Sequence, residues 1–159
     1  MRKADAANLR DHVLWLLDCK SAHVGFDAAL ADFPVKLRGA QHERIPYSAW
    51  QLLEHLRIAQ RDMLDYCRDP EHVSPAWPQE YWPTEAAPPS AAAWARSARA
   101  FRADGKAMRS LVSQRAGRLM QPMPHTPGVT LLTEALLIAD HNAYHIGQLV
   151  LLRRALGAW

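Results

Sequence analysis

Cysteine is scarce in this chain of 159 residues, which contains only Cys19 and Cys67. Two cysteines are too few for the disulfide framework of a small secreted protein, and both fall in segments with a helical pattern. We therefore expect reduced thiols and a cytoplasmic protein.

Long hydrophobic runs are missing as well. A transmembrane helix needs about 20 mostly apolar residues, and no segment of this sequence approaches that length. Near the N-terminus only Val13 to Leu17 is continuously apolar, which is too short for the core of a signal peptide. We expect no membrane partner.

A large excess of one charge is also absent, because the net charge is only +3. The basic residues of one predicted helix do share a flank, formed by Arg99, Arg102, Lys106 and Arg109. That flank is either an anion or nucleic-acid patch or a solvated helix face. No groove-reading motif or aromatic stripe accompanies it, so we favour the solvated face and expect no nucleic-acid partner.

The alternation of a β-strand does not occur over any useful length, whereas apolar residues recur at the three-and-four spacing of helices. The pattern predicts long helices at about 5–20, 48–68, 90–115 and 130–156, with a short helix at 24–33. We therefore predict an all-α protein, a four-helix bundle of the up-and-down type, with residues 1–159 as one domain.

Residues that favour helix starts precede most of these segments. Asp5 is a candidate cap for the first helix, and Thr130 is one for the last. Ser48 and Gln51 fit the capping box, in which each side chain satisfies a free amide of the first turn.

Proline and tryptophan are concentrated between the second and third long helices. Residues 70–89 contain six of the eleven prolines, together with Trp77 and Trp82. Proline disfavours regular structure, but disordered linkers are poor in aromatic residues. We expect an ordered loop whose Trp-Pro pairs cover one end of the bundle; alternatively, these aromatics only seal the core.

The last helix has two apolar faces when residues are placed at 100° steps. One comprises Leu137, Ile138, His141, His145, Leu149 and Leu152, and the opposite one comprises Leu132, Leu136, Ala139, Ala143, Ile146 and Val150. A helix that is apolar nearly all round is central in its fold or also packs on a partner chain, so a homodimer is expected.

His141 and His145 are one helical turn apart on the first of these faces, and His55 lies on the inward face of the second long helix. Imidazole is a common ligand of divalent metals, and three protein ligands leave a position open for water or substrate. Burying the rings without partners would cost a few kcal/mol. The spacing therefore favours a metal site, with hydrogen-bonded core histidines as the alternative. Polar neighbours that could orient the ligands are Gln51, Asp62, Glu134 and Gln148.

Two segments resemble the DinB-like superfamily. They are Ser48-Ala49-Trp50-Gln51-Leu52-Leu53-Glu54-His55-Leu56-Arg57-Ile58-Ala59-Gln60 and Asp140-His141-Asn142-Ala143-Tyr144-His145-Ile146-Gly147-Gln148-Leu149. The resemblance extends from about residue 8 to 156. It implies a four-helix bundle, often a homodimer, whose metal ligands are His55, His141 and His145. The metal in such proteins is typically zinc or nickel, and characterised relatives include transferases and isomerases that use low-molecular-weight thiols.

Three functional hypotheses follow. The first is a metal-dependent enzyme that activates a water or a thiol for hydrolysis or thiol transfer. The second is a non-catalytic metal-binding or stress-response protein, and the third is a metal-free bundle. No general base can be assigned from the sequence, although Glu134 is a candidate.

Overall fold

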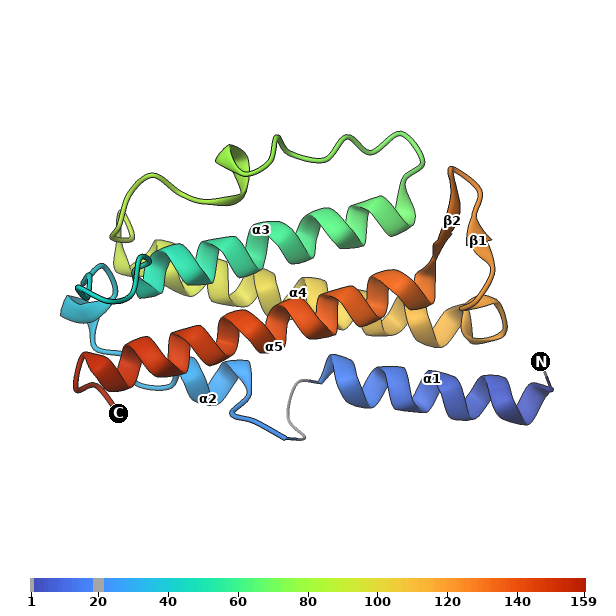
Figure 1. Ribbon diagram of the computed structural model, residues 1–159, viewed down its shortest axis with the longest axis horizontal. Coiled ribbons are helices and arrows are strands. Elements are labelled where there is room, and N and C mark those ends of the chain that lie inside the picture. Colours follow the sequence, from blue (N-terminus) through green and yellow to red (C-terminus); the bar gives the residue numbers. More distant parts are fainter. Residues whose placement is uncertain (1, 19–21) are drawn as a thin grey trace.

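Four long helices form the bundle in the computed structural model, which describes residues 2–18 and 22–159. They are α1 (Lys3–Leu17), α3 (Ala49–Arg68), α4 (Ala91–Gln114) and α5 (Leu131–Ala155), and the short α2 (Phe26–Leu30) follows α1. Figure 1 shows the long helices lying side by side along the longest axis of the molecule. The predicted all-α class is confirmed. Cys19 lies outside the described residues.

The predicted helix starts at Ser48 and Thr130 are confirmed, and the one at Asp5 is wrong. Ser48 and Gln51 form the complete capping box at α3, and the Thr130 hydroxyl accepts from the amide of Thr133 at α5. α1 instead begins at Lys3, so Asp5 lies inside its first turn, where it pairs with Arg2. An acidic residue in a first turn interacts favourably with the helix dipole without being the cap.

The expected up-and-down order holds from α1 to α3 and from α4 to α5, but not from α3 to α4. The connection after α3 returns along the bundle, so α3 and α4 start at the same end (Figure 1). Contacts between them confirm the parallel direction, because Gln60 bonds to the Phe101 carbonyl and Arg61 pairs with Asp104 one turn further along. The proline-rich segment 70–89 is this long crossover.

Short elements fill the connections. They are the 3₁₀ helices η1 (Val35–Leu37), η2 (Gln79–Tyr81) and η3 (Ala116–Arg118), and a hairpin of β1 (Pro122–Met123) and β2 (Thr126–Thr130). The hairpin was not predicted, because its strands are short and proline-rich. Gly128 adopts a φ of 89° in β2, a conformation that favours glycine.

The core consists of two apolar halves separated by a polar layer. One half surrounds Leu53, Trp94 and Leu149, and the other surrounds Leu64, Met108 and Ile138. Between them lie four buried polar residues of α3 and α5, namely His55, Gln60, Asn142 and His145. A buried polar group is costly unless it is bonded, so this layer requires specific partners.

α5 is central, because it packs against α1, α2, α3 and α4. The predicted division of α5 into two apolar faces needs correction. Ile146 and Ala139, assigned to the face for a partner chain, are buried within this chain. The large apolar residues that remain exposed on α5 are Leu136, Leu137, Tyr144 and Leu151.

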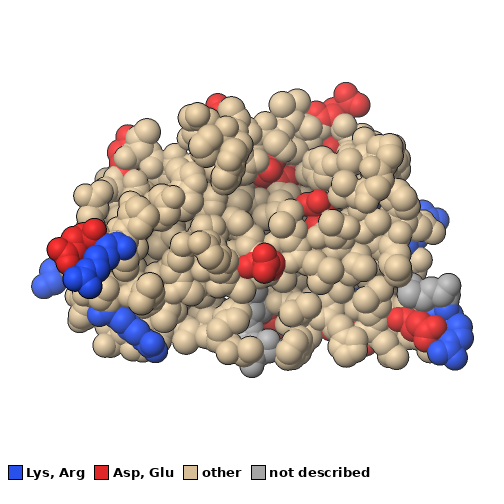
Figure 2. Space-filling model, in the orientation of Figure 1, with Lys and Arg blue, Asp and Glu red and all other residues tan. Residues whose placement is uncertain are grey.

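The basic flank of α4 is solvated and partly neutralised. Arg102 pairs with Asp27, and Arg109 pairs with Asp18. On the face of the molecule that Figure 2 shows, where α5 lies in front of α4, Lys and Arg are found at the two ends. Among the described helices, none combines the length and apolar character needed to span a membrane.

Replacing Ser48 tests how the crossover is attached to the bundle. The Ser48 hydroxyl caps α3 and also donates to the carbonyl of Ala86 at the end of the crossover. Ser48→Ala should lower the free energy of unfolding by about 2 kcal/mol, the sum of a lost cap and a lost buried bond. The control is Ser90→Ala, since Ser90 caps α4 by accepting from the amide of Ala93. It should cost about 1 kcal/mol in urea unfolding. Equal effects of the two substitutions would contradict this role of Ser48.

Candidate metal centre

The three predicted ligands meet in the polar layer. The Nε2 atom of His55 lies 3.1 Å from Nε2 of His145 and 3.1 Å from Nε2 of His141. α3 supplies the first ring, and successive turns of α5 supply the other two. The structure thus brings together, from two antiparallel helices, the three side chains that the sequence assigned to one site.

The hydrogen bonds of two rings determine which nitrogen faces the centre. His55 donates from Nδ1 to the carbonyl of Tyr81 at 3.0 Å, and His145 donates from Nδ1 to Oε1 of Gln148 at 2.7 Å. A neutral imidazole has one N–H, so Nε2 of both rings carries a lone pair. Two lone pairs 3.1 Å apart repel each other unless a cation lies between them. The donor set therefore fits a metal ion.

The spacing of the nitrogens agrees with that reading. Zinc–imidazole bonds are about 2.0–2.1 Å long, so two nitrogens of a tetrahedral zinc site are separated by about 3.3 Å. The 3.1 Å separations are close to this value. His55, His141 and His145 would hold a zinc ion with three nitrogens, and a four-coordinate ion would then have one position for another ligand.

Burial keeps the rings in the form that binds metal. Desolvation lowers the pKa of His55 and of His141 to about 4, and it also lowers the pKa of His145. Neighbouring rings lower the pKa of His55 and His141 further. All three are therefore neutral near pH 7, and neutral imidazole is the ligand form.

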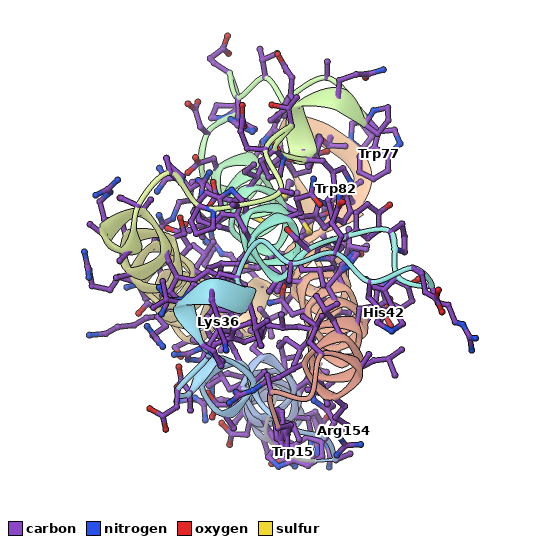
Figure 3. All side chains as sticks on the ribbon, turned by 90° about the vertical axis from the view of Figure 1, so that its left-hand side faces the viewer. Trp15, Lys36, His42, Trp77, Trp82 and Arg154 are labelled. Atoms are coloured by element: carbon purple, nitrogen blue, oxygen red, sulfur yellow. The ribbon has the colours of Figure 1, made fainter. Side chains whose placement is uncertain are left out.

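The crossover covers one side of the site with aromatic rings. Trp82 stacks on His55 with ring centroids 3.8 Å apart, and Tyr47 stacks on the other side of Trp82 at 4.0 Å. Trp77 and Trp82 lie on the same side of the bundle (Figure 3). The Trp-Pro segment thus packs on the metal centre, where the sequence suggested the end of the bundle.

A pocket of about 250 Å³ opens beside the three rings. The side chains of Ala59, Met63, Trp77 and Leu137 supply apolar walls, and Asp62 and Tyr81 supply polar groups. Because this pocket reaches the histidines, a small molecule in it could contact a metal held there.

The comparison with protein families agrees with the fold and the site. The profile of the DinB superfamily matches residues 22–149, which contain all three histidines. The chain belongs to the DinB superfamily. Comparisons with curated proteins and with solved structures gave no match.

Asp62 anchors the crossover beside the DinB histidines. Its carboxylate accepts the Tyr81 hydroxyl at 2.6 Å and is 2.7 Å from Nε2 of His72. Burial and this carboxylate raise the pKa of Tyr81 to about 12, so the phenol stays protonated. The Asp62 contact thereby fixes the residue whose carbonyl orients His55.

Two buried amides, those of Gln60 and Asn142, lie in the polar layer, and Asn142 follows His141 directly in α5. Gln60 donates to the Phe101 carbonyl at 2.6 Å, and Asn142 donates to Oε1 of Gln60 at 2.8 Å. Nδ1 of His141 and Oδ1 of Asn142 are both buried without a bond of normal geometry. Burial and the two neighbouring rings lower the pKa of His141, and the adjacent side chain of Asn142 opposes them only in part. Because both atoms are buried and lack a partner, we predict that Asn142 orients His141.

Of the four orienting residues proposed from sequence, only Gln148 bonds to a ligand. Gln51 serves the capping box instead, and Asp62 acts through Tyr81. Glu134 is buried, and burial raises its pKa. No sequence pattern marks the Tyr81 carbonyl, because any residue supplies one. Trp82 was expected to cover the end of the bundle and not a metal ligand, and Asn142 stood out only as the neighbour of His141.

The other histidines and Cys67 are not placed to bind a metal at the centre. His12, His23 and His42 lie away from it, and His125 approaches the Tyr66 carbonyl. Burial raises the pKa of the Cys67 thiol to about 12, so this cysteine is not a nucleophile near neutral pH.

Substitution of Asn142 tests its orienting role. Asn142→Leu should weaken zinc binding by about 10–100-fold, the usual effect of losing a group that orients a ligand. Asn142→Asp keeps an acceptor beside His141 and should lose less affinity. Competition with a chromophoric chelator measures both. An Asn142→Leu variant that folds and binds zinc like the wild type would contradict the role.

The lowered histidine pKa values predict a pH dependence of the metal-free protein. Unfolded histidines titrate near 6.5 and the folded His55 and His141 near 4, so between these values the unfolded chain binds more protons. The free energy of unfolding should therefore be highest above pH 6.5 and fall toward pH 4. Urea unfolding with a chelator present measures it.

In His141→Gln the free energy of unfolding should fall less steeply with decreasing pH, because one of the histidines with a lowered pKa is gone. His12→Gln is the control, since His12 is exposed, and it should keep the slope. The same slope in His141→Gln and the wild type would show that this ring does not titrate as described.

Proposed function

We propose that this DinB protein is a metal-dependent enzyme. His55, His141 and His145 would hold one divalent ion and leave one position for a water or a low-molecular-weight thiol. The observation that carries the proposal is the convergence of three Nε2 atoms, of which those of His55 and His145 are unprotonated, beside an open pocket. A structural metal site has four protein ligands and no such opening.

The protein's own groups prepare this site. When bound, the ion supplies Lewis acidity, which makes a water or a thiol nucleophilic near neutral pH. The Tyr81 carbonyl and Gln148 hold two rings in the ligating tautomer, and Trp82 shields His55 from water. The apolar walls would bind the body of an electrophilic substrate, and Asp62 and Tyr81 would orient its polar group.

Zinc and nickel are the metals we propose, because both accept imidazole nitrogens. The family resemblance supports thiol transfer or isomerisation as the reaction, with hydrolysis as a second possibility of the same site. We place the protein in the cytoplasm, which agrees with the free, buried thiol of Cys67.

A non-catalytic metal-binding or stress-response protein is the alternative. It is favoured by the lack, among the described pocket residues, of a free general base. Both oxygens of Asp62 already bond, to His72 and to Tyr81. In this reading the pocket would only bind a ligand.

Metal content tests the ligand assignment. Protein purified without a histidine tag should carry close to one zinc or nickel ion per chain, and His145→Ala should lose it. His12→Ala removes an exposed histidine and should retain full metal content. Elemental analysis measures all three. A metal-free wild type that takes up no zinc on addition would refute the site.

Turnover separates the enzyme from the binding protein. The metal-loaded chain should transfer bacillithiol, mycothiol or glutathione to an electrophile, or hydrolyse a substrate, at a rate that His145→Ala reduces to background. Full metal occupancy without turnover on a broad panel of electrophiles would favour the alternative.

A further inference from the structure

Two segments that border the metal pocket are rich in acidic residues and contain no Lys or Arg near it. The crossover, residues 70–89, supplies Trp77 and Tyr81 to the pocket wall, and α5 supplies Leu137. The crossover contains three glutamates and no basic residue, and α5 contains two acidic residues before its first basic one, Arg153. These five acidic residues are Glu71, Glu80, Glu85, Glu134 and Asp140.

The third wall of the pocket is α3, whose nearby basic residues form ion pairs elsewhere. Arg57 pairs with Glu54 at 2.9 Å in a groove between α3 and α4. Arg61 pairs with Asp65 at 2.6 Å and with Asp104 of α4 at 3.3 Å. None of the described residues that line the metal pocket is Lys or Arg. The acidic charges beside the pocket are therefore not balanced by its walls.

Two of the acidic residues are exposed next to groups that line the pocket. The Glu80 carboxylate accepts the amide of Ala76 at 2.6 Å, within the turn of the crossover that lines the pocket. Asp140 directly precedes His141 and lies one turn after Leu137. Within the described part of the chain, neither Glu80 nor Asp140 forms an ion pair. We call these two carboxylates the acidic rim.

Figure 2 shows the same distribution of charge over a whole face of the molecule. Asp and Glu atoms appear in the middle of the face that α5 crosses, whereas Lys and Arg lie at its two ends. Charges of one sign beside a cleft with apolar walls produce a focused field, because little solvent screens them there. The acidic rim should therefore act on charged groups that enter the pocket.

Aromatic rings beside the acidic rim favour the same kind of group. Trp77 is 68% exposed and packs edge-on against Tyr81, with ring centroids 5.2 Å apart. The face of a Trp or Tyr ring attracts a cation. Both the rings and the rim thus favour an ammonium or an uncharged group in the pocket over a carboxylate.

Two positive groups act inside the pocket and limit where the rim has its effect. His72 lies 2.7 Å from Asp62 and neutralises this carboxylate when it is protonated. A divalent ion held by three neutral imidazoles would keep its double positive charge. It would attract the atom of a ligand that binds to it, whereas the rim acts on the rest of that molecule. The rim therefore discriminates at the end of a ligand that lies away from the metal.

We propose that the metal pocket selects small molecules whose far end is uncharged or cationic and disfavours those whose far end is anionic. Repulsion of the wrong ligand gives specificity as effectively as attraction of the right one. The inference rests on the proposed metal site, and it narrows the thiols of the turnover test to those without a carboxylate.

Three small thiols of similar size test the selection. Cysteamine ends in an ammonium group, 2-mercaptoethanol in a hydroxyl and mercaptoacetate in a carboxylate. Calorimetry with the zinc-loaded protein should give a Kd for mercaptoacetate at least about 10-fold above that for cysteamine at an ionic strength of about 10 mM, with 2-mercaptoethanol between them. The ratio should shrink at about 150 mM, because salt screens the rim.

Substitutions of Asp140 separate the rim from the chemistry of the thiols. Asp140→Asn should lower the ratio of the two Kd values by about 3-fold and Asp140→Lys by about 10-fold, in proportion to the charge removed. The intrinsic affinity of each thiol for zinc cancels when this ratio is compared between proteins. Asp11→Lys is the control, because it makes the same change of charge on α1, whose described residues do not line the pocket. It should leave the ratio unchanged.

Elemental analysis of the same samples distinguishes two kinds of failure. A wild-type chain that binds no zinc would refute the metal site and this inference with it. With zinc fully bound, three results would overturn the selection alone: no binding of any of the thiols, mercaptoacetate binding as tightly as cysteamine, or a ratio that Asp140→Lys leaves unchanged.

Discussion

The structure depends on how three imidazoles, two of them buried and that of His141 half-buried, are kept neutral and directed at one point. Each ring sits between two apolar halves of the core, where a charged ring would be expensive. Bonds from Nδ1 of His55 and His145 commit the only ring proton and turn both Nε2 lone pairs inward. A cation between these two nitrogens would relieve the repulsion of their lone pairs. The packing that keeps the rings neutral therefore also prepares them to bind a metal.

The unusual path of the chain follows from this constraint. A short loop between α3 and α4 would make them antiparallel and leave His55 without an acceptor for its N–H. The crossover instead returns along α3 and places the Tyr81 carbonyl and the Trp82 ring against His55. Asp62, two turns after His55 on α3, holds Tyr81 in place through its hydroxyl. The proline content of the segment reduces the entropy lost when so long a connection is ordered.

The helices and the metal ligands could be predicted from the sequence because both depend on local spacing. The capping box at Ser48 and the i, i+4 pair of His141 and His145 are visible in a few consecutive residues. The parallel direction of α3 and α4 and the Tyr81 carbonyl depend on contacts between distant segments, which no short pattern encodes. The exposed face of α5 was misplaced for a similar reason, since helical periodicity does not tell which apolar arc its neighbours cover.

X-ray absorption at the metal edge of the native protein tests the central claim most directly. Three imidazole nitrogens at about 2.0–2.1 Å, plus one light ligand, are the coordination expected of zinc in this site. The imidazole scattering should fall by one ring in His145→Ala reconstituted with zinc. A spectrum without imidazole scattering, or one that His145→Ala leaves unchanged, would contradict a centre built from His55, His141 and His145.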